Sequence, residues 1–329
     1  MARHVPIEFD PQRAIHTLWP WRDDLWPDRL TQARIEFAQF LRLVAEPGDD
    51  GARTPIVIQA ANAASHADAK ARCGDFASIH RAAYGDVWAR DTGPVFAKSG
   101  AGLKAVRFGF NGWGGKFLYE DDQEIGAAIA SLGDAEPIVS TLICEGGALE
   151  FDGAGTLLTT RDVVLNPNRN PGLTEAQFEA EMARLFGIER VIWLERGLVG
   201  DHTDGHIDNI ARFIAPGRVV CQHANGSDDP NREVFEEIET NLKTAGLDVV
   251  SIPSPGRVEL EHGSVDPASH MNWVVGARNL VMPVYNGAGE RAAQVLQDAL
   301  KSHEVVASPS RTILSGGGSF HCVTCNQPA

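Results

Sequence analysis

The apolar residues of this chain form short runs of strand length, separated by single stretches of helical periodicity. Residues 29–44 place one apolar face of a helix at Leu30, Ala33, Phe37, Phe40, Leu41 and Val44. A capping-box spacing from Thr174 to Gln177 predicts a second helix, with a buried stripe of Phe178, Met182, Leu185 and Phe186. Further helices are expected at about 231–245 and at about 290–300.

Strands are predicted between these helices, often in pairs. They are expected at 55–58, in a run that ends in 86–94, and at 105–108, 138–144, 149–151, 156–160, 191–194, 205–214, 218–221, 249–252, 273–275 and 280–284. The glycines of 111–116 argue against regular structure there, and Asp152-Gly153 predicts a hairpin. Because no Pro/Ser-rich or low-complexity seam divides the chain, we expect one α/β domain over residues 1–329.

Composition narrows the class of protein. An apolar share of 43% and a charged share of 22% are typical of a globular domain. The 29 Lys and Arg against 44 Asp and Glu give a net charge of −15, which argues against nucleic acid and anionic membranes as main partners. No segment has the apolar length of a signal peptide or a membrane span, so we expect a cytoplasmic protein.

The five cysteines do not form the pattern of a disulfide framework, because their number is odd and they are spread through a long chain. Cys73, Cys144 and Cys221 are therefore interpreted as small core residues. Cys322 differs, since it follows the three glycines of 316–318. Glycine runs are costly to order and allow close approach to the backbone, so this segment predicts a presented thiol, although a plain Gly-rich turn would also fit.

Three polar motifs stand at predicted strand ends, namely Arg90-Asp91, Glu145-Gly146-Gly147 and Gly205-His206-Ile207-Asp208. If 205–214 is a strand, its period of two places His206 and Asp208 on one face. Together with Cys322 these candidates recur about once per fifth of the chain, with one position missing. Such spacing is typical of a closed radial array of strand-rich units, each of which contributes a residue to a central channel.

Other interpretations have weaker support. Cys322 and Cys325 have the CxxC spacing of a redox or zinc pair, but no second CxxC is present. His202 and His206 are four apart, yet the intervening Thr-Asp-Gly is poor helix material. Neither phosphate-binding loop pattern occurs in full, so nucleotide binding is not expected.

The ordered set of motifs resembles the agmatine deiminases of the guanidine-modifying, or pentein, superfamily. The set comprises Trp19-Pro20, Trp88-Ala-Arg-Asp-Thr-Gly-Pro94, Phe110-Asn-Gly-Trp-Gly-Gly-Lys116, Glu145-Gly-Gly147, Leu165-Asn-Pro-Asn-Arg-Asn-Pro-Gly172, Gly205-His-Ile-Asp-Asn209 and Gly316-Gly-Gly-Ser-Phe-His-Cys322. The resemblance covers nearly the whole chain. One departure is Cys325-Asn326-Gln327, where the family commonly has a glutamine run, and it puts a second thiol close to Cys322.

The resemblance implies a five-bladed α/β propeller of ββαβ-type units around a central site. It further implies Cys322 as nucleophile, His206 as general acid and base, and Glu145 as the residue that orients His206. Asp91 and Asp208 would hold the guanidinium, while Trp88 and Trp113 would line the substrate pocket. It implies no metal or organic cofactor, and a homo-oligomer.

The expected reaction converts agmatine and water to N-carbamoylputrescine and ammonia, a step toward putrescine. Deimination of arginine or peptidyl arginine is the alternative within the superfamily; those substrates carry a carboxylate and need a cationic pocket mouth. Trp21, Asp23 and Asp24 are the hypothetical walls for the agmatine amine. A non-catalytic propeller used as a binding scaffold, and a thiol-redox or zinc protein, remain as other classes.

Overall fold

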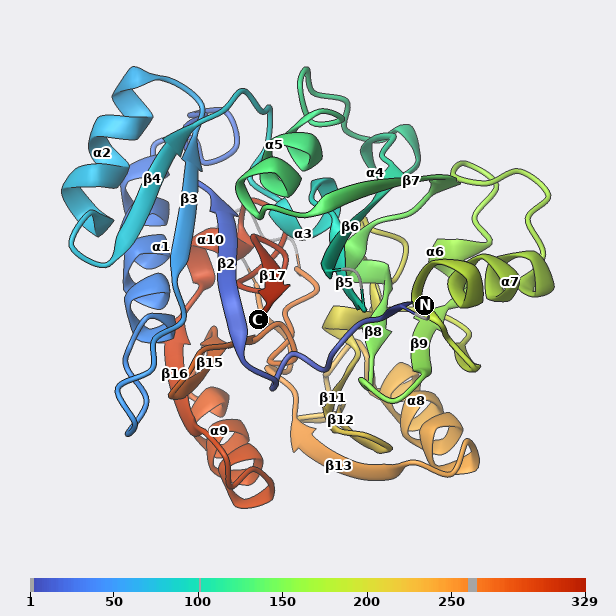
Figure 1. Ribbon diagram of the computed structural model, residues 1–329. Coiled ribbons are helices and arrows are strands. Elements are labelled where there is room, and N and C mark those ends of the chain that lie inside the picture. Colours follow the sequence, from blue (N-terminus) through green and yellow to red (C-terminus); the bar gives the residue numbers. More distant parts are fainter. Residues whose placement is uncertain (1–2, 101, 260–264) are drawn as a thin grey trace.

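Five separate sheets make up the strand framework of the described residues, which are 3–100, 102–259 and 265–329 of a computed structural model. Figure 1 shows these sheets around a common centre, with helices such as α2, α7, α8 and α9 on the outer side. The α/β prediction is confirmed, and five sheets agree with the five units implied by the family resemblance.

Four of the sheets share one construction, an antiparallel strand pair followed by a helix and a parallel strand. The first of the four also includes the short strand β1 (Arg3–His4) at its edge. The first unit comprises β5 (Val95–Ser99), β6 (Gly102–Gly109), α5 (Ile125–Leu132) and β7 (Glu136–Ile143), and the second comprises β8 (Glu150–Phe151), β9 (Thr156–Thr160), α6 (Arg161–Val164), α7 (Glu175–Phe186) and β10 (Arg190–Leu194). The third unit comprises β11 (Ala211–Ala215), β12 (Arg218–His223), α8 (Arg232–Thr244) and β13 (Asp248–Pro253). The fourth comprises β14 (Val274–Val275), β15 (Asn279–Val284), α9 (Ala288–Ala299) and β16 (Glu304–Pro309).

The two ends of the chain meet in the remaining sheet. Its strand order is β17 (Thr324–Pro328), β2 (Gln12–Leu18), β3 (Ile56–Ala60) and β4 (Ala77–Arg81), with α1 (Leu30–Val44) and α2 (Ala63–Cys73) as the crossovers. Strand β17 pairs antiparallel with β2. This pairing completes the ring and fixes the segment just before β17, which carries Cys322.

The predicted helical faces are buried as expected. Every apolar residue of the stripe predicted within 29–44 is buried on one face of α1. Helix α7 begins with the capping box of Thr174 and Gln177 and ends at Gly187, whose φ of 68° lies in the left-handed region. The Asp152-Gly153 hairpin is confirmed between β8 and β9.

Two predicted strand segments are wrong. The run through 86–94 ends in a single helical turn, α3 (Ala89–Thr92), and Ile207–Asn209 is the 3₁₀ turn η2 that precedes β11. His206 and Asp208 therefore do not share a strand face. Residues 112–115 form one helical turn, α4 (Gly112–Gly115), with left-handed φ values at Trp113 and Gly114. Within the described residues, no helix is long and apolar enough to cross a membrane.

Candidate active site

The five acid, base and thiol residues singled out by the sequence come from four separate connections and are each at most 5% exposed. Asp91 lies in α3, Glu145 precedes the 3₁₀ turn η1 (Gly146–Ala148), His206 and Asp208 lie at η2, and Cys322 lies between α10 (Arg311–Leu314) and β17. The contacts between them, given below, show that the fold brings all five together at its centre.

The His206 ring lies between two carboxylates. Its Nδ1 is 3.6 Å from Oδ1 of Asp91, and its Nε2 is 3.6 Å from Oε2 of Glu145. Burial alone would lower the pKa of His206, but Asp91, Glu145 and Asp208 outweigh burial and raise this pKa to about 9. The ring is therefore an imidazolium near neutral pH and can give up a proton.

Glu145 is anchored on its far side by a buried arginine. Nε of Arg169 lies 2.9 Å from both carboxylate oxygens, and Nη1 of Arg169 donates to Asp204 at 2.7 Å. Burial works to raise the pKa of Glu145, but His206 and Arg169 hold it below its usual range. Sequence reasoning did not single out Arg169, although it stands in the 165–172 motif.

Asp91 is oriented by two donors. The indole Nε1 of Trp113 donates to Oδ2 at 2.9 Å, and the backbone N–H of Gly147 donates to Oδ1 at 3.1 Å. Trp113 reaches Asp91 from a left-handed backbone conformation, with φ 54° and ψ 52°. Burial raises the pKa of Asp91 to about 6, against the attraction of His206.

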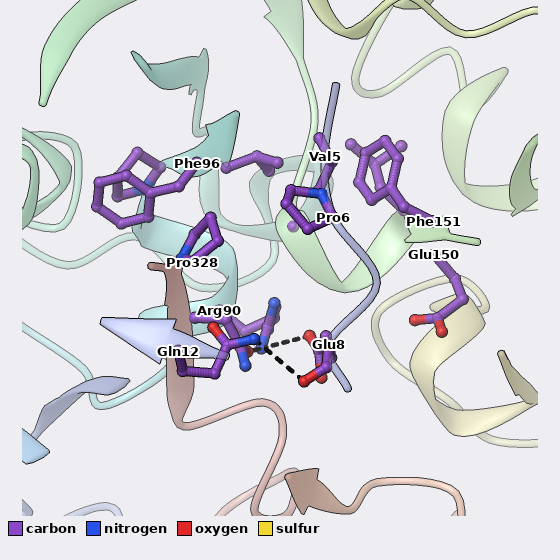
Figure 2. Close-up of a pocket in the computed structure, with 14 residues that line it drawn as sticks. Val5, Pro6, Glu8, Gln12, Arg90, Phe96, Glu150, Phe151 and Pro328 are labelled. Carbon is purple, nitrogen blue, oxygen red and sulfur yellow. Dashed lines mark hydrogen bonds and ion pairs between the residues drawn. The ribbon is translucent and has the colours of Figure 1, made fainter. Parts of the chain in front are cut away.

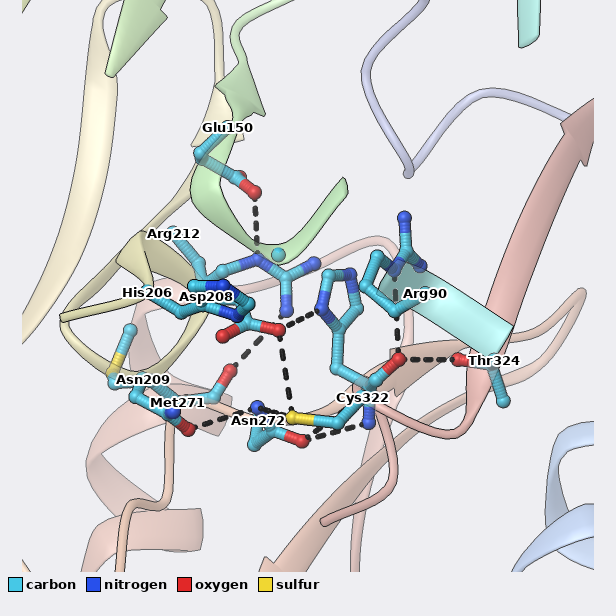
Figure 3. Close-up of polar contacts among 12 residues, drawn as sticks. Arg90, Glu150, His206, Asp208, Asn209, Arg212, Met271, Asn272, Cys322 and Thr324 are labelled. Carbon is cyan, nitrogen blue, oxygen red and sulfur yellow. Dashed lines mark hydrogen bonds and ion pairs between the residues drawn. The ribbon is translucent and has the colours of Figure 1, made fainter. Parts of the chain in front are cut away.

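The Cys322 thiol faces Asp208 and Asn272, as Figure 3 shows. Its Sγ lies 3.7 Å from Oδ2 of Asp208 and 3.1 Å from Nδ2 of Asn272. Oδ1 of the same Asn272 accepts the backbone N–H of Cys322 at 3.1 Å. No sequence signal pointed to Asn272. Burial, Asp208 and Asp91 raise the pKa of Cys322 well above its usual value.

Asp208 presents one free oxygen to the site. Its Oδ2 lies 2.8 Å from Nδ1 of His321, whereas Oδ1 is buried and has no hydrogen-bond partner among the described residues. Burial opposes ionisation, but His321, His206 and Arg212 hold the pKa of Asp208 below its usual range. A buried ionised oxygen without a partner suits a cationic ligand.

A pocket opens above this cluster and reaches Cys322 and Asp91. Its other lining residues are Leu25, Asp86, Trp88, Trp113, Phe117, Tyr119, His202, Thr203, Gly316 and Gly317. Trp88 and Trp113 thus line the pocket with the thiol. Trp21, Asp23 and Asp24 are all absent from this lining. Asp23 and Asp24 are exposed, and Asp24 pairs with Arg22 at 2.5 Å, so the hypothesis that these residues form the pocket wall is wrong.

The glycine run before Cys322 is explained by close packing. A Cβ at Gly316 would lie 2.5 Å from the ring of Trp26, and one at Gly318 would lie 2.6 Å from the ring of Trp88. Gly317 has a φ of 120°, which side chains rarely adopt. The run therefore serves close approach, as the sequence predicted.

The second thiol of this region is directed elsewhere. Sγ of Cys325 donates to the carbonyl of Pro94 at 3.2 Å, and burial raises its pKa to about 12. Cys73, Cys144, Cys221 and Cys325 are all buried and free.

Comparisons with known proteins agree with the family resemblance. A putative agmatine deiminase of Vibrio parahaemolyticus is 31% identical over 99% of this chain and 97% of its own length, and an agmatine deiminase of Pseudomonas aeruginosa is 32% identical over 99% and 95%. The solved structure of a C. jejuni agmatine deiminase variant with substrate bound superposes with a TM-score of 0.91 at 26% identity, over 99% of this chain and 96% of that chain.

The family assignment rests on the whole chain. A model of the Porphyromonas-type peptidyl-arginine deiminase family matches residues 4–328, which span every blade and every site residue described above. The chain is therefore a member of the Porphyromonas-type peptidyl-arginine deiminase family, as its agmatine deiminase relatives and structures also indicate.

Proposed function

We propose that this protein hydrolyses agmatine to N-carbamoylputrescine and ammonia through a covalent intermediate on Cys322. The observation that carries the proposal is that the Cys322 thiol and Asp91 line one pocket, while the buried His206 ring contacts Asp91 and the buried Asp208 contacts the thiol. The names of the Vibrio and Pseudomonas relatives support the same substrate.

Asp91 and Asp208 are proposed to bind the guanidinium. A planar guanidinium offers paired N–H donors that match carboxylate oxygens, and charge-assisted bonds fix its carbon over the nucleophile. Asp208 has a buried oxygen without a partner, and Asp91 is already oriented by Trp113 and Gly147. Both carboxylates are thus prepared before the ligand arrives.

Binding of this cation activates Cys322. In the free protein the neighbouring carboxylates Asp208 and Asp91 disfavour the thiolate. A bound guanidinium neutralises both, so its arrival lowers the pKa of the thiol and favours loss of the thiol proton to solvent. The thiolate then adds to the guanidinium carbon and forms the C–S bond of a tetrahedral adduct.

His206 supplies the proton for the leaving group. Its imidazolium protonates the departing nitrogen, the C–N bond breaks, and ammonia leaves an amidino-thioether. The neutral ring then takes a proton from water, whose hydroxyl adds to the same carbon. The hydroxyl proton of this second adduct passes to the departing sulfur as the C–S bond breaks, which releases the ureido product and restores the Cys322 thiol. Glu145, fixed by Arg169, keeps the ring in place.

The pocket wall supports an amine tail rather than a carboxylate. Asp86 is buried in the wall, and burial raises its pKa to about 7, a value that a bound cation would lower. The lining residues among the described part of the chain include no lysine or arginine, and Arg22, which stacks on Tyr119 of the wall, is already paired with Asp24. Trp88 and Trp113 are proposed to pack on the aliphatic part of the substrate.

The test is ammonia release from agmatine, free L-arginine and an arginine-terminated peptide, offered separately. Release from agmatine alone, abolished in Cys322→Ser and preserved in Cys325→Ser, is the expected result. Cys325→Ser is the matched control because Cys325 is equally buried but bonds to Pro94. Ammonia release from an arginine substrate would contradict the assignment of agmatine as the substrate. No release from any of the three compounds would favour the binding-scaffold interpretation. A homo-oligomer in the cytoplasm stays a prediction.

A further inference from the structure

A chain of ionisable groups stands behind Asp208, on the side away from its free oxygen. Nδ1 of His321 lies 2.8 Å from Oδ2 of Asp208, and Nε2 of the same ring lies 2.9 Å from Oε1 of Glu8. The ring is 1% exposed. Both of its nitrogens are therefore committed to carboxylate oxygens, one from η2 and one from the N-terminal segment.

This geometry selects one protonation state of the ring. A neutral imidazole has one N–H and one lone pair, so one nitrogen would turn its lone pair toward a carboxylate oxygen. A protonated carboxyl would remove that conflict, but cations other than this ring favour the ionised form of each carboxylate. Arg90 and Arg212 pair with Glu8. His206 and Arg212 act on Asp208. Only the imidazolium donates to both partners.

Two arginines hold the outer carboxylate in its ionised form. Nη2 of Arg90 lies 3.1 Å from Oε1 of Glu8, and Nη2 of Arg212 lies 2.6 Å from Oε2. Arg212 also donates to Glu150 at 2.8 Å, as Figure 3 shows. Figure 2 shows Glu8 beside Arg90 and Gln12 in the wall of a second pocket. Among the linked groups Asp208, His321 and Glu8, Glu8 therefore lies nearest the surface.

The same peptide segment carries the nucleophile. The backbone N–H groups of His321 and Cys322 both donate to Oδ1 of Asn272, at 2.9 and 3.1 Å. A shift of His321 would therefore move Cys322 and Asp208 relative to each other. The titratable groups that contact the ring are Asp208 and Glu8. Arg90 and Arg212 pair with Glu8, and Cys322, next in the chain, contacts Asp208.

We propose that His321 is a positioning residue that works as a doubly donating imidazolium. It holds Oδ2 of Asp208 so that Oδ1 stays free for the substrate cation, and Glu8 is its counter-charge. The protonation state is a property of the free protein; only the effect on turnover rests on the proposed deiminase function.

The first test does not depend on activity. Nitrogen-15 labelling of the histidines of the full chain, with His321→Asn to assign the signal, reports the two ring nitrogens directly. Nearly equal shifts for both, with a proton on each near neutral pH, are the expected result. Well-separated shifts, the mark of one protonated and one bare nitrogen, would overturn the proposal.

The second test compares two isosteric variants that each remove the negative charge of a carboxylate paired with Arg212. Glu8→Gln also removes the charge that faces His321, whereas Glu150→Gln leaves His321 untouched. We expect Glu8→Gln to raise KM for agmatine about tenfold, with a smaller change in kcat, because a charge-assisted contact behind the substrate carboxylate weakens. Glu150→Gln should keep KM within about twofold of wild type.

A merely structural role for Glu8 predicts a different pattern, namely less active protein at an unchanged KM. That pattern, or equal effects of the two variants, would contradict the proposal. If the wild-type protein turns over another guanidine and not agmatine, the proposed function fails, but the same KM comparison applies to the substrate found. If it turns over none, the nitrogen shifts alone decide the protonation state.

Discussion

The absence of a side chain at Gly147 is what allows His206 and Asp91 to meet. An added Cβ would lie 2.4 Å from Nδ1 of His206 and 2.9 Å from Oδ1 of Asp91. The φ of Gly147 lies outside the left-handed region, so alanine suits the backbone and only the space is missing. Gly147→Ala therefore tests the packing of the His206 ring by a single methyl group.

The expected size of the effect follows from that distance. An ordinary van der Waals separation is about 3.5 Å, so the imidazole must withdraw by about 1 Å. A displacement of about 1 Å at a catalytic group costs about 100-fold in rate. Overpacking should also lower the free energy of unfolding by about 1–3 kcal/mol.

The assay combines steady-state ammonia release from agmatine with thermal unfolding of each variant. Gly287→Ala is the matched control, because nothing in the described structure lies within 4 Å of a Cβ at Gly287, and it should keep both rate and stability. In a His206→Ala background, Gly147→Ala should add little further loss of rate, since the displaced ring is gone.

A folded Gly147→Ala variant with a rate within about threefold of wild type would refute this reasoning. If the single variant does not fold, the double variant with His206→Ala should recover folding, because the closest clash of the methyl is then gone and only the contact with Asp91 remains. A double variant that also stays unfolded would show that the methyl acts on something other than the ring.

Three further predictions follow from the charges of the site. The pH profile of kcat/KM should be bell-shaped, falling below about 6 as Asp91 gains a proton and above about 9 as His206 loses its own, and a rate that still rises past pH 9 would contradict the acid role. Arg169→Leu should lower the free energy of unfolding by about 3–5 kcal/mol in denaturant titrations, because the buried Glu145 would lose its hydrogen-bonded arginine and keep only the longer contact with His206; an unchanged midpoint would speak against the Arg169–Glu145 pair. Asp86→Asn should raise KM for agmatine much more than it lowers kcat. A fold decrease in kcat as large as the fold increase in KM would show that Asp86 does not bind the amine tail of the substrate.

Local patterns determined much of this protein. The helical stripe of 29–44 and the capping box at Thr174 specify α1 and α7, because burial and capping act over a few neighbouring residues. The strand-helix order indicated the α/β class, and the ordered motifs indicated the family. The five site residues also came from the sequence, through motifs that stand at the ends of elements.

Only the tertiary structure decided how those residues face one another. The 3₁₀ turn at Ile207–Asn209 and the helical turn at Ala89–Thr92 replace predicted strands, since contacts from other blades outweigh local preference there. Asn272 and Glu8 carry no local signal, because their partners lie 50 and 313 residues away in the sequence. Arg169 stands in a recognised motif, but its role depends on Glu145, 24 residues away. The local sequence specifies which chemical groups are present. The distances between them, and the charges that shift their pKa values, are set only when strand β17 pairs with β2 and closes the ring of five sheets.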